Sequence, residues 1–227
     1  EQDRGREAEA GFRHVIARLQ SLHLTDDPLY GNAMGNLGNL YLVQENYSQA
    51  DALLQQSKRW FDAHPDAPAK DRANLLSNLA HAAHGLEDLV RADALYAQAH
   101  EVMQAVYPDG SPDQAVLLNN RAMLNEDRGD LSKALALHRQ SLAMRRAVFS
   151  NEHPMTLTAL TNVARLELAN EAPSQALALA EEAARMADRV YNGETNPRHA
   201  STWATLADAR FANSDMDGAS IAMQRAT

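Results

Sequence analysis

Residues 111–148 read SPDQAVLLNNRAMLNEDRGDLSKALALHRQSLAMRRAV, a stretch that contains two helical patterns separated by a turn. Ser111 and Pro112 are typical of a helix start, because serine caps the first turn and proline lacks only a donor that this turn does not use. Apolar residues then recur at helical spacing up to Gly129 and Asp130, which indicate a turn. A second helix is expected to follow that turn. The stretch is therefore predicted to form a helical hairpin.

The hairpin pattern recurs along the chain. Its clearest marker is an alanine of the second helix that returns every 42 residues, and after 43 at the last step: Ala8, Ala50, Ala92, Ala134, Ala176 and Ala219. Other positions keep this register: Asn36, Asn78, Asn120 and Asn162, and the turn residues Asn46, Asp88, Asp130 and Asp215. A fixed period predicts stacked units rather than one globular core. No alternating run reaches strand length, so the predicted fold is all-α.

We expect one elongated array over residues 1–227. Its expected parts are a lone second helix at 1–24, full repeats at 28–62, 70–105, 112–149 and 154–191, and a last repeat at 197–227 that stops inside its second helix. Terminal repeats normally carry a polar outer face, and neither end has one. The sequence thus suggests a piece of a longer protein, whose uncapped ends would allow self-association.

Composition narrows the class of partner. Lysine and arginine total 21 against 30 aspartate and glutamate residues, a net charge of −9. Nucleic-acid binding depends on clustered positive charge, so a nucleic-acid partner is not expected. No run of about 18 apolar residues occurs, so we expect no membrane span. The chain has no cysteine, which removes disulfides and thiolate metal ligands from consideration.

Several short motifs together resemble a known repeat family. They are the run NLGNLY at 36–41, NLA at 78–80, and the turn-plus-alanine stretches NYSQA at 46–50 and DLSKA at 130–134. The combination is similar to the tetratricopeptide repeat, in its long, kinesin-light-chain-like variant. The resemblance implies a right-handed superhelical solenoid of antiparallel helix hairpins, whose concave face is lined by the first helices. Arg121, the Glu171-Ala172-Pro173 turn and Ala222 depart from the pattern and are expected to weaken the last repeats.

The repeated asparagines are the strongest candidates for a binding site. The resemblance places them on the concave face, where an amide can both donate to and accept from an extended peptide backbone. The alternative is that they bond a neighbouring helix of the stack. The predicted peptide-binding groove consists of Asn36, Asn39, Asn78, His81, Asn119, Asn120, Asn162 and Arg165. Arg165 is expected to be its one cation.

No sequence motif indicates catalysis or a cofactor. His81 and His84 have a spacing that could hold a metal, but no third ligand is apparent, so no metal site is predicted. Adjacent carboxylates such as Glu126 and Asp127 are expected to form solvated helix faces.

We therefore predict a cytoplasmic protein- or peptide-binding scaffold without enzymatic activity of its own, the interaction or regulatory module of a larger protein. Two alternatives stay open. One is a regulator that senses a short peptide and changes its superhelical pitch. The other is the regulatory arm of a fused enzyme, such as a kinase or a protease.

Overall fold

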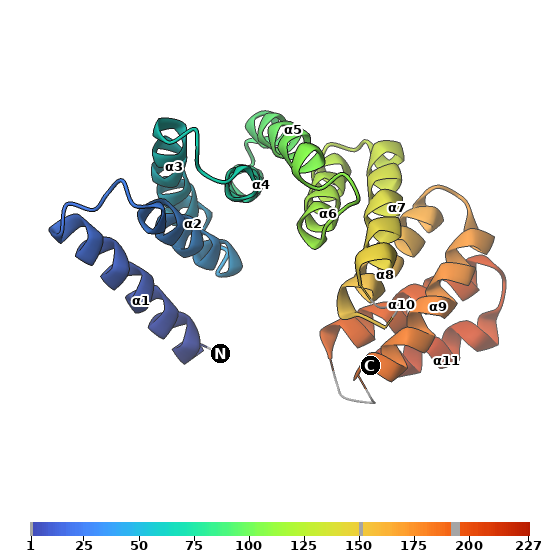
Figure 1. Ribbon diagram of the computed structural model, residues 1–227. Helices are drawn as coiled ribbons and strands as arrows, with labels where there is room; N and C mark the ends of the chain where they lie inside the picture. Colours follow the sequence, from blue (N-terminus) through green and yellow to red (C-terminus); the bar gives the residue numbers. More distant parts are fainter. Residues whose placement is uncertain (1, 150–151, 192–195) are drawn as a thin grey trace. The chain divides into compact units, whose positions relative to one another are not determined.

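The computed structural model describes residues 2–149, 152–191 and 196–227, where helices are joined by short turns and loops (Figure 1). No strand occurs in these ranges, and the predicted all-α class is confirmed. The helices are α1 (Gln2–Ser21), α2 (Pro28–Val43), α3 (Tyr47–Ala63), α4 (Ala69–Gly85), α5 (Leu89–Val106), α6 (Pro112–Asp127), α7 (Leu131–Val148), α8 (Pro154–Ala169), α9 (Pro173–Tyr191), α10 (Pro197–Ala212) and α11 (Met216–Ala226).

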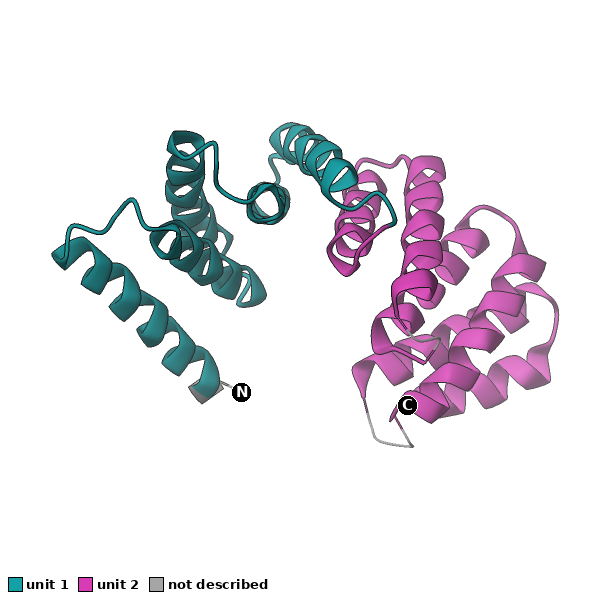
Figure 2. Cartoon of the chain, in the orientation of Figure 1, with its two compact units in different colours: residues 1–109 teal, residues 110–227 magenta. Residues whose placement is uncertain are grey.

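The chain divides into two compact units, with the boundary between Asp109 and Gly110 (Figure 2). Unit 1 contains α1 to α5, and unit 2 contains α6 to α11. In both units, each even-numbered helix packs against the odd-numbered helix that follows it. We call these the first and second helices of each hairpin. That all of residues 1–227 form one continuous array stays a prediction.

The repeated polar residues in the turns between paired helices are helix caps. A side-chain oxygen before α3, α5, α7 and α11 accepts a hydrogen bond from the backbone N–H three residues further on; the capping residues are Asn46, Asp88, Asp130 and Asp215. Such a bond satisfies one of the donors that a helix start leaves unpaired. The first helices α2, α6, α8 and α10 begin at a proline that follows a side-chain cap, as the sequence pattern predicted.

The turns inside the hairpins share one left-handed residue. The positive φ angles are 57° at Glu45, 61° at Glu87, 78° at Gly129, 56° at Glu171 and 65° at Ser214. This conformation costs an ordinary L-residue about 1–2 kcal/mol, so the packing of the two helices must impose it. The Glu171-Ala172-Pro173 turn departs from the sequence pattern, yet Glu171 adopts the same left-handed conformation as the other four residues.

Small residues sit at the closest helix crossings. The repeated Ala50, Ala92, Ala134 and Ala176 are all 0% exposed. Gly38 of α2 faces this position in the first hairpin, and a Cβ atom there would lie 2.6 Å from Leu54. Two helices can approach this closely only where neither carries a bulky side chain. The outer members of the series differ, since Ala8 is exposed and Ala219 is half-buried.

Candidate functional site

The first helices of unit 1 border a cavity of about 220 Å³, which we call the amide cavity. It lies between α2 and α4, with α3 behind it. Its lining residues are Gly31, Asn32, Gly35, Asn36, Ser57, Phe61, Asp71, Asn74, Leu75 and Asn78. Two predicted groove residues, Asn36 and Asn78, are therefore brought together here.

Two glycines of α2 shape the amide cavity. A Cβ atom at Gly31 would lie 2.4 Å from the Trp60 ring, so glycine is needed there for α2 to approach α3. The Ser57 hydroxyl of α3 donates a hydrogen bond of 2.9 Å to the Gly31 carbonyl and fixes this contact. At Gly35 a Cβ atom would meet only Ser57 Oγ, at 3.4 Å. Gly35 therefore leaves open space in front of Phe61, which is 2% exposed.

Asn32 and Asn74 line the amide cavity although they were not predicted as groove residues. The sequence contained the relevant information, because each lies four residues before an asparagine of the repeated series, which places it one turn earlier on the same helix face. Four neutral amides thus line the cavity together with the apolar side chains of Phe61 and Leu75. The cavity offers donors and acceptors above an apolar surface.

The two other predicted groove residues of unit 1 lie outside the amide cavity. Asn39 is exposed on α2. His81 of α4 faces Tyr47 of α3, with 6.0 Å between the ring centroids. Burial, together with the nearby His84, lowers the pKa of His81. A neutral imidazole packed against a tyrosine indicates a structural contact between α3 and α4.

In unit 2 two predicted groove residues bond each other. Asn162 Nδ2 of α8 donates to Asn119 Oδ1 of α6 over 3.2 Å. This contact matches the alternative in which the asparagines join neighbouring helices. Asn162 also lines a cavity of about 180 Å³ between α8 and α10, together with Thr161 and Arg198. Asn120 is half-buried on α6.

Arg165 differs from the isolated groove cation that was expected. Its guanidinium forms an ion pair with Glu126 of α6, whose other carboxylate oxygen lies 2.8 Å from Nε2 of the fully buried His138 of α7. Burial by itself would raise the pKa of Glu126, but the hydrogen bonds from His138 and Arg165 outweigh it and hold the pKa below its usual value. The expectation that Glu126 belongs to a solvated face was wrong. Glu126 joins three helices of unit 2.

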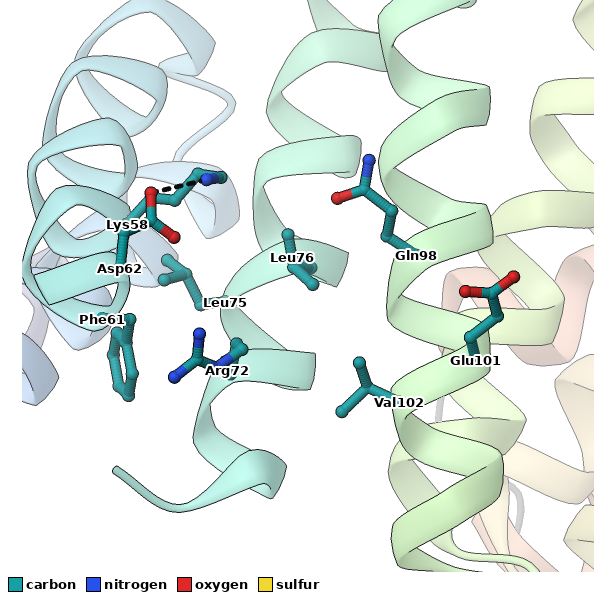
Figure 3. A pocket seen from close by; sticks show the side chains of 9 residues that line it. All are labelled: Lys58, Phe61, Asp62, Arg72, Leu75, Leu76, Gln98, Glu101 and Val102. Carbon is teal, nitrogen blue, oxygen red and sulfur yellow. Dashed lines mark hydrogen bonds and ion pairs between the residues drawn. The ribbon is translucent and has the colours of Figure 1, made fainter. Parts of the chain in front are cut away.

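A second cavity of unit 1, of about 290 Å³, opens between the second helices α3 and α5 and is floored by α4 (Figure 3). We call it the apolar cavity, after Phe61, Leu75, Leu76 and Val102 in its wall. Charges of both signs surround it: Lys58 forms an ion pair with Asp62 at 2.7 Å, and Arg72 and Glu101 also line it. Phe61 and Leu75 border both cavities.

Over 2–149, 152–191 and 196–227, no three histidine, aspartate or glutamate side chains are grouped so that they could hold a metal ion. In the same ranges, no helix combines the length and the apolar character that crossing a bilayer requires.

Comparison with known proteins defines the class. A model of the tetratricopeptide repeat matches residues 71–147 and again 113–189, together just over half of the chain. The chain belongs to the tetratricopeptide repeat family, and the helix hairpins are its repeats. Arrays of such repeats present extended binding surfaces. No curated protein sequence matches the chain.

Solved structures extend the likeness beyond the matched residues. The crystal structure of BtubC (BKLC) from P. vanneervenii has a TM-score of 0.83 at 16% identity, covering 98% of this chain and 89% of the other. A putative kinesin light chain from P. anserina with nearly identical repeats has a TM-score of 0.69 at 19% identity, covering 93% and 94%. NprR, solved in complex with its cognate peptide NprX, has a TM-score of 0.61 at 13% identity, covering 98% and 66%. These values support the kinesin-light-chain-like type of repeat.

Proposed function

We propose that this chain is a scaffold that binds an extended segment of a partner protein, and that the amide cavity of unit 1 is where the segment is held. The observation that carries the proposal is the arrangement of Asn32, Asn36, Asn74 and Asn78 around a buried apolar floor. A side-chain amide offers both donors and an acceptor, so Asn32, Asn36 and Asn78 can pair with a peptide backbone of almost any sequence.

The size of the amide cavity favours a peptide over a small molecule. Small-molecule sites usually enclose about 300–1,000 Å³, whereas this cavity measures about 220 Å³ and is open. Such a volume suits one side chain of a longer segment, whose backbone would continue along the first helices. The family supports the same reading, and so does the peptide bound in the NprR structure.

The predicted residues of unit 2 are assigned a smaller share of binding. Asn119 and Asn162 already satisfy each other, and Arg165 is paired with Glu126. A peptide would have to break these contacts before it gained any. We therefore assign the first contacts of the segment to Asn36 and Asn78.

The test compares two double variants of the whole chain. A peptide selected from a random display library is titrated calorimetrically against Asn36→Ala/Asn78→Ala and, as the matched control, Asn119→Ala/Asn162→Ala. Each hydrogen bond lost should cost about 0.5–1.5 kcal/mol, so the first variant should bind about 1–3 kcal/mol more weakly. The control should keep most of the affinity but melt at a lower temperature, because it loses a bond between helices.

Unchanged affinity in Asn36→Ala/Asn78→Ala, with a lowered melting temperature, would show that these asparagines join helices and that the ligand binds elsewhere. Because Asn36 is exposed and Asn78 is half-buried, their replacement should hardly affect unfolding. A binding role of these asparagines thus predicts weaker binding at an unchanged melting temperature, whereas a structural role predicts unchanged binding at a lower melting temperature.

A second candidate function is a regulator that changes shape when it binds a short peptide, as an interaction module of a larger protein. The NprR structure with its cognate peptide favours this candidate. Small-angle scattering of the chain with and without the selected peptide tests it, since a scaffold of fixed shape would keep its radius of gyration. For either function we expect a protein partner, because the net charge of −9 disfavours nucleic acid.

A further inference from the structure

We propose that the amide cavity selects a partner segment that carries a lysine or arginine side chain, and that Asp71 binds this cation. The inference rests on the proposed function, because it specifies the ligand of the same site. Its basis is the charge distribution around the cavity in unit 1.

Asp71 is the one charged residue among the lining residues of the amide cavity. It is half-buried, and it forms no ion pair or hydrogen bond through its carboxylate within the described part of the chain. Helix α2, which forms the opposite wall, contains no charged residue over 28–43. Of the two basic neighbours of Asp71, Lys70 is exposed and Arg72 donates to the His64 carbonyl over 3.2 Å. The carboxylate therefore faces a cavity without a cation.

The position of Asp71 on its helix favours a negative charge. It lies in the first turn of α4, where the helix dipole and the unpaired N–H groups favour negative charge. This stabilisation does not neutralise the carboxylate, which still presents its charge to the cavity. A cation that enters the cavity would gain from the same field.

The floor of the amide cavity suits the stem of a basic side chain. Lysine and arginine place their methylene groups on apolar surface and keep the charged head near polar groups. Phe61 and Leu75 would contact the stem. The asparagines would hold the backbone on either side. The overall charge of −9 would draw a basic segment towards the protein.

The apolar cavity provides the contrast. Both signs of charge surround it, with Lys58 and Asp62 paired and Arg72 and Glu101 on different helices (Figure 3). It therefore has no single preference for a cation. Glu101, an exposed carboxylate at that cavity, serves as a matched control for Asp71, because the same change of charge can be made there without altering the amide cavity.

The experiment selects binders from a random peptide display library with the whole chain. Binders lost in Asn36→Ala/Asn78→Ala are kept as amide-cavity ligands, synthesised and titrated against the chain, Asp71→Asn and Glu101→Gln. We expect lysine or arginine to be enriched in these ligands. Asp71→Asn should weaken them about tenfold, as for the loss of one partly exposed charged hydrogen bond, and Glu101→Gln should leave the affinity unchanged. Raising the ionic strength from about 0.1 M to 1 M should weaken binding to the chain more than to Asp71→Asn, because it shortens the Debye length from about 10 Å to about 3 Å.

Each failure has its own pattern. Amide-cavity ligands without enriched basic residues, or with equal affinity for Asp71→Asn, would overturn the cation proposal and leave the peptide-binding function standing. If no selected peptide depends on Asn36 and Asn78, the proposed function and the cation proposal both fail. Equal weakening by Asp71→Asn and Glu101→Gln would show a general charge effect rather than a contact with Asp71, and would also overturn the inference.

Discussion

Gly31 and Gly35 lie one turn apart on the same face of α2, yet replacing each by alanine should change stability in opposite directions. Glycine in the middle of a helix is less favourable than alanine by about 0.5–1 kcal/mol, so both substitutions begin with that gain. What differs is the space available to the new methyl group. The comparison therefore isolates the packing of α2 on α3 beneath the amide cavity.

At Gly35 the methyl group would lie 3.4 Å from Ser57 Oγ, which is an ordinary contact. The helix gain should persist, and Gly35→Ala should be more stable than wild type by about 0.5–1 kcal/mol. At Gly31 the methyl group would lie 2.4 Å from the Trp60 ring. Overpacking of this kind costs about 1–3 kcal/mol, and separating the helices would also stretch the bond from Ser57, worth about 1 kcal/mol. Gly31→Ala should lose about 1–3 kcal/mol after the helix gain is subtracted.

Thermal melts of the three proteins followed by circular dichroism provide the measurement. A change of 1 kcal/mol corresponds to about 2–4 °C for a domain of 150–250 residues, so the two variants should be well separated. A Gly31→Ala variant that melts at or above wild type would refute the close approach of α2 and α3. A Gly35→Ala variant that melts below wild type would show that the position is not open, and with it the amide cavity would be called into question.

Three further tests concern features outside the amide cavity. Tyr96 is 0% exposed and its hydroxyl has no hydrogen-bond partner, whereas the Tyr41 hydroxyl donates to Glu9 over 2.7 Å. In thermal melts, Tyr96→Phe should therefore be at least as stable as wild type, and Tyr41→Phe should be less stable by about 1 kcal/mol. The reverse order of stability would contradict this prediction. A Cβ atom would meet nothing within 4 Å at Gly129 or at Gly11, but only Gly129 has a positive φ. In denaturant titrations, Gly129→Ala should therefore be less stable than wild type by about 1 kcal/mol, whereas Gly11→Ala should stabilise α1. Burial lowers the pKa of His81 below its ordinary value of 6.5, so on acidification the imidazole is protonated in the unfolded chain before it is protonated in the folded one. The stability that neutral His81 contributes is therefore complete above about pH 6.5 and is lost as the pH falls. The melting temperature of His81→Gln should depend less on pH than that of wild type.

The features predicted correctly from the sequence depend on the local backbone. Caps such as Asp88 and Asp130 satisfy donors only three residues away, and proline at Pro112 fixes a torsion of its own residue, so neither needs knowledge of a distant neighbour. The alanine series is also a local pattern, because the repeat returns each hairpin to the same packing. Periodicity thus determined the class of fold and the small residues at the helix crossings.

The residue pairs that connect neighbouring repeats were not predicted individually, although one interpretation of the sequence had the asparagines bond a neighbouring helix. Glu126 and Arg165 are 39 residues apart, and Asn119 and Asn162 are 43 apart, so only the stacking of α6 and α8 brings them together. Their residue types resemble those of a solvated face or an open groove.

Contacts with neighbouring side chains also explain why asparagines at the same repeat position have different surroundings in the two units. In unit 2 the residue before the repeated asparagine is Asn119, which can bond Asn162 across the stack. In unit 1 the corresponding residue is Ser77, which is buried, and the position before Asn36 is Gly35, which opens the cavity. A difference in one neighbouring side chain therefore accompanies the difference between a bond that joins two helices in unit 2 and asparagines that line a cavity in unit 1. Asp71 then adds a charge that the rest of the cavity wall does not balance, which is why we propose the first helices of unit 1 as the ligand site.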